Sequence, residues 1–100
     1  MYLTPFVANV PLADANTEYS YEIPKNTRKL GIFSRLQATL RFNFVPDVIQ
    51  AGIAAEYMTV QAGQSGFWLD AMYLKGRTLY VSSDSASDVL EVVGMKDTSL

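Results

Sequence analysis

The sequence contains no cysteine and no histidine. Without cysteine the chain forms no disulfide and offers no thiolate to a metal ion. Without histidine it lacks the commonest general base and metal ligand, which excludes serine and cysteine triads and most zinc or iron chemistry. We therefore expect no catalytic, cofactor-binding or metal-binding residues, and the chain is predicted not to be an enzyme.

Charged residues are scarce, at 18% of the chain against the roughly 25% that is usual for soluble domains. Apolar residues reach 49%, which is too many for a disordered chain and many for a lone monomer. A domain of this length buries only about 65% of its extended surface on folding. We therefore expect a homo-oligomer, with a trimer favoured, in which neighbouring chains cover apolar surface.

Long apolar runs are also missing. No stretch approaches the ~18 consecutive apolar residues of a membrane span. The first residues, MYLTPFVANV, lack the basic start and the small-residue cleavage site of a signal peptide. The expectation is a soluble product of the cytoplasm with no membrane partner.

The sequence does contain repeated alternation of apolar and polar residues, which is typical of β-strands. The clearest case runs from Thr17 to Ile23, where Tyr19, Tyr21 and Ile23 share one face. Phe6 to Val10 lies between two prolines, which favours an edge strand or an arm that reaches a neighbouring subunit. Further strands are predicted at 28–36, 39–45, 57–61, just after residue 66, 77–83 and 88–95.

The last two of these strands are joined by the turn Asp84-Ser85-Ala86-Ser87, and this pattern predicts a β-hairpin. The final strand is apolar on both faces, with Leu90 and Val92 on one and Val89, Val93 and Met95 on the other. Such a strand either lies in the centre of its sheet or is covered by a partner chain.

The strand predicted at 28–36 divides its side chains between two faces. Leu30, Ile32 and Leu36 are expected to point into the core, and Lys29, Phe33 and Arg35 to point outward. Residues 46–56 are predicted to be a connecting loop with at most a short helical turn, because Pro46 and Gly52 oppose a longer helix.

Seven to eight short strands without a convincing helix predict an all-β fold, an antiparallel β-sandwich of jelly-roll or Greek-key type. We divide the chain into an N-terminal arm or edge strand at 1–16, a sandwich domain at 17–95 and a C-terminal tail at 96–100. The order of the strands does not follow from the sequence.

Charge is distributed unevenly along the chain. The segment between Ile23 and Pro46 contains basic residues and no acidic residue, whereas acidic residues outnumber basic ones from Ser82 onward. A net charge of −2 argues against nucleic acid as the partner, so we expect the basic segment to dock on an acidic partner or on the acidic strand of an identical neighbour. The candidate interface residues are Lys29, Phe33, Arg35, Arg41, Val89, Val93 and Met95.

Three other groups of residues have both a functional and an ordinary structural interpretation. The ten carboxylates are interpreted as surface acids, with a spatial glycosidase-like pair as the open alternative. Asp84, Ser85, Ser87 and Asp88 are interpreted as a plain turn rather than a calcium loop, because the central glycine and alternating acids are missing. A third hypothesis is an aromatic platform for sugar rings. Its members would be Tyr57, Phe67, Trp68, Tyr73 and Tyr80.

The residue pattern of several segments resembles that of the small β-sandwich virion proteins of tailed bacteriophages, of the decoration or auxiliary type. The segments are TEYSYEIP (17–24), LRFNFV (40–45), QAGQSGFW (61–68) and, most tellingly, LKGRTLYVSSDSASDVLEV (74–92).

The resemblance implies a structural role in the virion without catalytic residues. The favoured role is a capsid decoration or cement protein that bridges subunits of the major capsid protein or contacts other virion proteins. The alternatives are a tail, collar or fibre component, or a carbohydrate-binding β-sandwich module.

Overall fold

The computed structural model describes residues 2–47, 49, 56–63, 66–70 and 76–98. Within them the regular elements are all β-strands. The strands are β1 (Leu3–Leu12), β2 (Tyr19–Glu22), β3 (Thr27–Ser34), β4 (Leu40–Asn43), β5 (Met58–Val60), β6 (Phe67–Asp70), β7 (Thr78–Ser83) and β8 (Asp88–Asp97). The predicted all-β class is confirmed.

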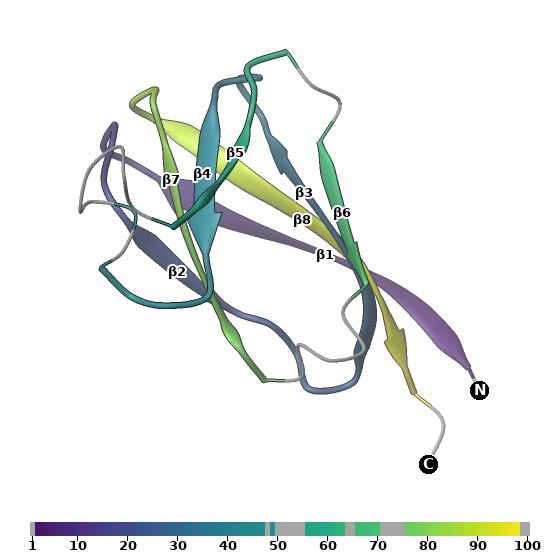
Figure 1. Ribbon diagram of the computed structural model, residues 1–100. Helices are drawn as coiled ribbons and strands as arrows, with labels where there is room; N and C mark the ends of the chain where they lie inside the picture. Colours follow the sequence, from purple (N-terminus) through teal and green to yellow (C-terminus); the bar gives the residue numbers. More distant parts are fainter. Residues whose placement is uncertain (1, 48, 50–55, 64–65, 71–75, 99–100) are drawn as a thin grey trace.

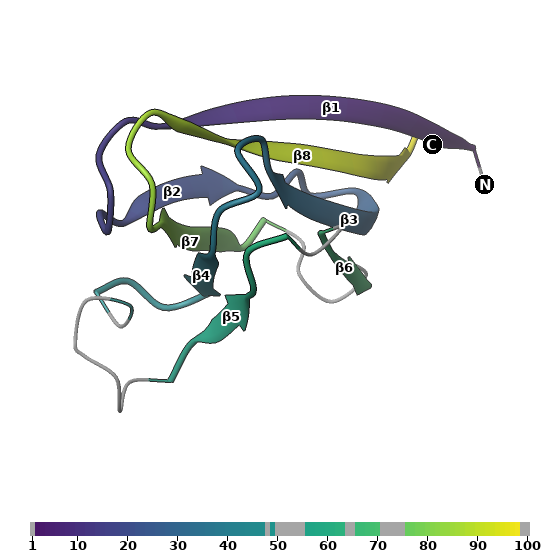
Figure 2. The same cartoon turned by 90° about the horizontal axis from the view of Figure 1, so that it is seen from above.

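The strands form two four-stranded antiparallel sheets. Sheet A has the order β1-β8-β3-β6 and sheet B the order β2-β7-β4-β5. The sheets pack face to face, and the ends of β1 and β8 next to the termini project beyond the rest as a two-stranded ribbon (Figures 1 and 2). The fold is therefore the predicted antiparallel β-sandwich.

The strand pairs are nested along the chain. β1 pairs with β8, β2 with β7, β3 with β6 and β4 with β5. The chain is thus one long antiparallel ribbon that doubles back between β4 and β5 and is wound into two sheets. This winding is the jelly-roll arrangement, which answers the question of strand order that periodicity left open.

The core lies between the inner faces of the two sheets. Sheet A contributes Leu30 and Ile32 from β3 together with Leu90 and Val92 from β8, and all four side chains are at most 1% exposed. Sheet B contributes further apolar residues in alternation, as the pattern predicts. These residues are Ile23, Leu40, Phe42, Val60, Leu79 and Val81.

The predicted hairpin is wrong. β7 and β8 are consecutive, but β7 lies in sheet B and β8 in sheet A, so the turn at 84–87 crosses between the sheets. Two strands separated by a short turn look the same in sequence whether they pair or cross. β8 lies between β1 and β3, so both of its edges are paired, and its second apolar face, with Val89, Val93 and Met95, lies on the side of sheet A that points away from sheet B.

Leu36 is a second correction, because its side chain is 54% exposed rather than part of the core. β3 ends at Ser34, and the backbone of Leu36 belongs to the turn that leads to sheet B. The backbone N–H of Leu36 donates to the carboxylate of Asp88, 3.1 Å away. This bond interrupts the alternation that parity had extended to residue 36.

Asp88 holds together the end of the sandwich at which β3 and β7 leave their sheets. Its side chain is 2% exposed. Oδ2 accepts hydrogen bonds from the hydroxyls of Ser34 (2.6 Å) and Ser83 (2.7 Å). Oδ1 accepts from the backbone N–H groups of Leu36 and of Val89, at 3.1 and 2.7 Å. One carboxylate therefore joins the ends of β3 and β7 to the start of β8.

Burial acts to raise the pKa of Asp88, but the hydrogen bonds from Ser34, Ser83, Leu36 and Val89 outweigh it and hold the pKa below the ordinary aspartate value. A lowered pKa means that the native state favours the ionised form. The resulting stability is fully present above the pKa of the unfolded chain, and it is lost as the pH falls through the lower pKa of the folded protein.

We predict that Asp88→Asn lowers the free energy of unfolding by about 1–3 kcal/mol at neutral pH, because it removes a charged acceptor from buried donors. Urea denaturation followed by circular dichroism measures this loss. Between pH 6 and pH 3 the variant should lose less stability than the wild type, since the carboxylate that titrates is gone.

The matched control is Asp84→Asn in the same turn. Asp84 is exposed, and its Oδ1 accepts from the N–H of Thr39 at 3.2 Å and, at 3.5 Å, from the hydroxyl of Ser85. A small effect is expected there. Equal losses in the two variants would show that the buried network of Asp88 has no special role.

Candidate protein–protein interface

The candidate site is the face of sheet A that points away from sheet B, hereafter the outer face of sheet A. Cross-strand register places its residues in rows, because directly opposed residues lie on the same side of a sheet. Val7, Val93, Gly31 and Trp68 form the central row. The neighbouring rows hold the other predicted interface residues of this sheet. These are Lys29 and Met95 on one side, and Phe33, Arg35 and Val89 on the other.

The central row is apolar and open to solvent. The side chain of Val7 is 73% exposed and that of Trp68 is 51% exposed. Val93 lies between β1 and β3 and is half-buried. Covering these apolar side chains with another surface removes them from water, which favours association.

Gly31 makes room for the tryptophan. A Cβ atom at this position would lie 2.9 Å from Cε3 and Cζ3 of Trp68 and 3.0 Å from Cε2 of Phe33. The indole ring therefore rests against the backbone of β3. Phe33 meets it edge to face, with ring centroids 5.7 Å apart and planes at 82°. Together the two rings form a fixed aromatic corner on the open face.

The charges around this face are matched within the chain. Arg35 Nε lies 3.0 Å from Glu91 Oε2, and Arg28 Nη2 lies 3.1 Å from Asp97 Oδ2. The acidic strand that was expected to attract a neighbour is β8, and it lies beside the basic strand β3 of the same chain. Basic and acidic segments that are far apart in sequence thus neutralise each other.

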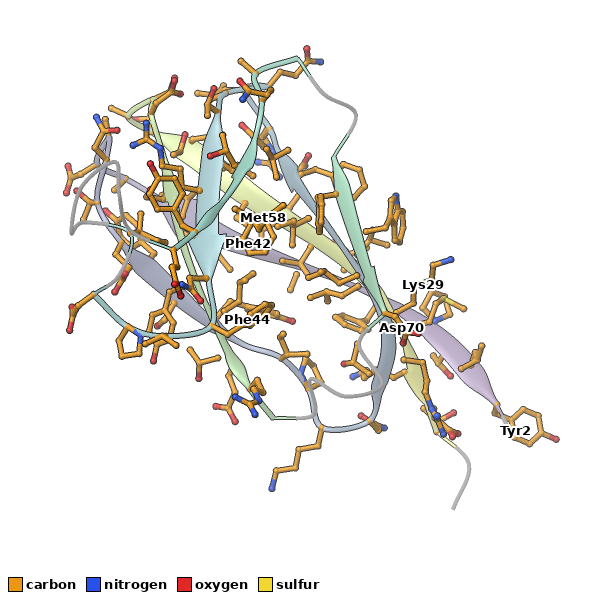
Figure 3. All side chains as sticks on the ribbon, viewed as in Figure 1. Tyr2, Lys29, Phe42, Phe44, Met58 and Asp70 are labelled. Atoms are coloured by element: carbon orange, nitrogen blue, oxygen red, sulfur yellow. The ribbon has the colours of Figure 1, made fainter. Side chains whose placement is uncertain are left out.

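Lys29 completes this arrangement. Its Nζ lies 5.7 Å from the centroid of the Trp68 ring, and its backbone is in register with Asp70. Figure 3 shows Lys29 and Asp70 close together on sheet A, while Tyr2 marks the end of the projecting ribbon. A depression of about 320 Å³ between Arg28, Lys29, Trp68, Leu69 and Asp70 adjoins the central row.

Arg41 is the exception among the candidate interface residues. It lies on β4 in sheet B, and its guanidinium carbon is 5.6 Å from the centroid of the Tyr57 ring. It therefore cannot extend the surface formed by Lys29, Phe33 and Arg35. The single basic patch that the sequence suggested does not form, because β3 and β4 follow each other in the chain but lie in different sheets.

The outer face of sheet B has a different character. Its register aligns Ser20 with Tyr80, Asn43 with Tyr80, and Arg41 with Ser82. These side chains are polar or carry a polar end. The contrast makes the outer face of sheet A the candidate protein interface.

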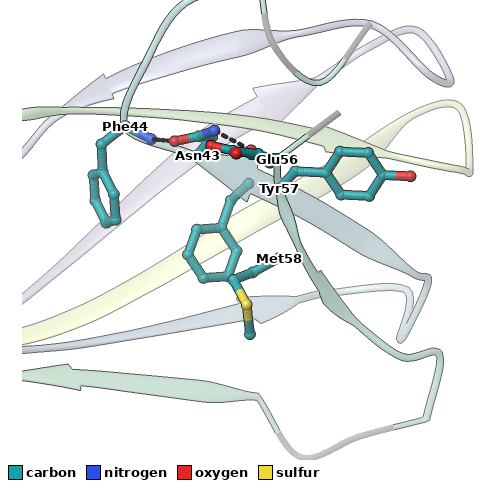
Figure 4. A pocket seen from close by; sticks show the side chains of 6 residues that line it. Asn43, Phe44, Glu56, Tyr57 and Met58 are labelled. Atoms are coloured by element: carbon teal, nitrogen blue, oxygen red, sulfur yellow. Dashed lines mark hydrogen bonds between the residues drawn. The ribbon is translucent and has the colours of Figure 1, made fainter. Parts of the chain in front are cut away.

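A second depression, of about 330 Å³, lies at the end of β4 and the start of β5. Phe42, Phe44 and Met58 line it, with Asn43, Glu56 and Tyr57 at its rim (Figure 4). The Asn43 amide donates to the backbone oxygen of Glu56, and Asn43 Oδ1 accepts from the N–H of Phe44. These bonds fix the rim. Both polar atoms of the Asn43 side chain are therefore hydrogen-bonded to the backbone.

The sugar-binding platform is not assembled by the described residues. Phe67 points into the core, with its ring centroid 5.3 Å from that of Phe42, while Trp68 points out of sheet A. Tyr57 and Tyr80 belong to the side of sheet B. Tyr73 lies outside the described residues.

The turn at 84–87 uses its carboxylates within the protein, since Asp84 and Asp88 accept the hydrogen bonds given above. Among the residues that the structure places, no group of three or more acidic side chains is arranged to hold a metal ion. In the same part of the chain there is no helix of the length and apolarity needed to cross a membrane.

The open edge of β1 is protected against pairing with another strand. The N–H of Thr98 donates to the carbonyl of Tyr2 at 2.8 Å, which sets the even-numbered residues of β1 toward β8. Odd-numbered residues therefore direct their backbone toward the edge, and both Pro5 and Pro11 are among them. Proline has no N–H to donate, so the face of sheet A is better suited to binding than its edge.

No protein-family model matches the chain, and no curated protein or solved structure shows significant similarity to it. The resemblance to phage virion proteins therefore stays a prediction from the sequence. The functional argument rests on the geometry of the outer face of sheet A.

Sequence reasoning did not include Val7 or Trp68 among the candidate interface residues, and it assigned Trp68 to the aromatic platform instead. Val7 has the same parity as Pro5 and Pro11, which indicates a solvent-facing position, but its neighbour Val93 follows only from the pairing of β1 with β8. The nested order of strands was needed to bring residues 7, 31, 68 and 93 into one row.

We predict that Gly31→Ala destabilises the protein by about 1–3 kcal/mol, because the added methyl group meets the Trp68 ring. In a Trp68→Ala background the same change should cost less, since only the contact with Phe33 at 3.0 Å remains and alanine is otherwise the better strand residue. Urea denaturation of the four proteins at low concentration gives the coupling energy. Equal costs in both backgrounds would mean that the ring does not rest on Gly31.

Proposed function

We propose that this protein is a non-enzymatic structural protein of a phage particle, and that it works through protein–protein contacts made by the outer face of sheet A. The favoured role is a capsid decoration or cement protein, which resides in the virion and bridges subunits of the major capsid protein. Tail, collar and fibre proteins are variants of the same proposal with a different neighbour.

The observation that carries the proposal is the apolar row of Val7, Val93 and Trp68 on sheet A, which no described segment of the chain covers. A monomer has no use for such a surface, whereas an assembly component needs one. The jelly-roll winding adds general support, because capsid proteins use this architecture, although lectins and cupins use it too.

The charge arrangement supports apolar rather than electrostatic docking. Arg28 and Arg35 are paired with acids of the same chain, and Arg41 lies on the other sheet. Exposed ion pairs contribute only about 0–1 kcal/mol each. We therefore expect the docking affinity to depend only weakly on salt concentration. Docking through a basic patch would give a strong dependence.

The carbohydrate-binding alternative has less support. Those of its aromatic residues that the structure describes are divided among the core and both sheets, so Trp68 would act without Phe67, Tyr57 and Tyr80. A glycan array therefore serves as a direct comparison with particle binding.

We predict that the purified protein co-sediments at a fixed ratio with particles of the virus that encodes it, and that a glycan array stays blank. Trp68→Glu should reduce retention by about tenfold or more, because it places a charge in the centre of the contact. The control Arg41→Glu should leave retention unchanged, since Arg41 lies on sheet B.

Strong glycan binding with no retention on particles would overturn the proposed function in favour of a carbohydrate-binding module. Retention that falls with Arg41→Glu and is unaffected by Trp68→Glu would assign the contact to sheet B. Immunogold labelling of intact particles separates the head role from the tail roles.

A further inference from the structure

We infer that the outer face of sheet A binds a second copy of this chain, face to face, as a two-fold symmetric dimer. This inference rests on the proposed function, and it makes the neighbour that covers this surface in the particle a second copy of the chain rather than a capsid subunit. It replaces the trimer that composition favoured, since composition indicates that surface is buried but does not specify a symmetry.

Charge complementarity points to a second copy. The face carries bases and acids in adjacent pairs, Arg35 with Glu91 and Arg28 with Asp97, and Lys29 lies in register with Asp70. A strongly acidic or basic partner would find as many repulsive as attractive charges on such a face. A copy with the same balanced pattern meets no net repulsion.

The apolar row fits its own copy when one molecule is turned over about the strand direction. This rotation exchanges β1 with β6 and β8 with β3, because sheet A has the order β1-β8-β3-β6. It places Val7 of one copy over Trp68 of the other, so the bulkiest side chain of the row meets a small one. Two sheets stacked about 10 Å apart with nearly aligned strands are a common packing.

The available area fits a reversible dimer. Four strands at about 4.8 Å spacing and five rows at about 6.8 Å give at most roughly 650 Å² per copy, or about 1,300 Å² in total. Specific interfaces begin near this total. Pro5 and Pro11 oppose growth from the open edge of β1. A two-fold face-to-face contact uses the same face of both copies, so it closes after two copies.

Sedimentation velocity over about a hundredfold range of concentration tests the inference, because association follows mass action. We expect a monomer at low concentration and a dimer at high concentration, with no larger species. Trp68 is the only tryptophan, so its emission should shift to shorter wavelength and its quenching by acrylamide should fall as the dimer forms.

Val7→Glu should abolish dimerisation, because it places a charge in the central row, and the 73% exposure of Val7 allows the variant to fold. Val45→Glu is the matched control, since Val45 is 53% exposed and follows β4 on the side of sheet B. It should leave dimerisation unchanged.

A wild-type protein that stays monomeric throughout the series, or a dimer that persists in Val7→Glu, would overturn the inference. Retention on particles by a monomeric wild type would leave the proposed function standing without the dimer. A dimer that never binds particles would instead refute the proposed function alone.

Discussion

The fold depends on the buried carboxylate of Asp88. A jelly roll passes between its two sheets at almost every connection, and each crossing leaves backbone N–H groups without a strand partner. Asp88 accepts such groups from Leu36 and Val89, and it binds the hydroxyls of Ser34 and Ser83. It thereby satisfies two crossings at one end of the sandwich. The remaining contacts of that end, such as the N–H of Asn16 with the carbonyl of Ser83 at 2.7 Å, are built around it.

The same winding determines which surface is left open. Because the first strand pairs with the last, β8 becomes an inner strand of sheet A and brings Val93 and Met95 to a face that no segment of the described chain covers. β3 lies on its other side and supplies Phe33 and Gly31. The apolar surface is formed by segments that are distant in the sequence, and none of them indicates the surface by itself. Pairing of β3 with β8 also neutralises the charges of both strands, so the surface is left apolar and nearly neutral.

Much of the fold could be predicted from the sequence, because alternation specifies which strand residues are buried. Tyr19 and Tyr21 share one face of β2 as predicted, Ile23 just after it is buried, and Leu79 and Val81 are buried on β7. Pairing could not be predicted in the same way. Residues 77–95 have the local pattern of a hairpin. β8 lies in the other sheet because it pairs with β1 and β3 there, and because the buried side chain of Asp88 binds the turn at its start. Leu36 fails for a related reason, since parity continues past the residue at which a strand ends.

The candidate interface residues illustrate the same division. Lys29, Phe33, Val89, Val93 and Met95 were correctly grouped as outward residues, because each alternates with a buried neighbour, and Arg35 continues their parity past the end of β3. Arg41 also points outward, but from the other sheet, and no feature of its own strand reveals this. Val7 and Trp68 needed the register of β1 with β8 and of β3 with β6 before their common row became visible.

Hydroxyl-radical footprinting of the assembled protein against the dilute monomer tests the central claim that the outer face of sheet A is a buried interface. Trp68 reports on this face, and Tyr80 on sheet B serves as the reference within the same molecule. The account predicts that oxidation of Trp68 falls strongly on assembly while that of Tyr80 changes little. Unchanged oxidation of Trp68 together with protection of Tyr80 would contradict it.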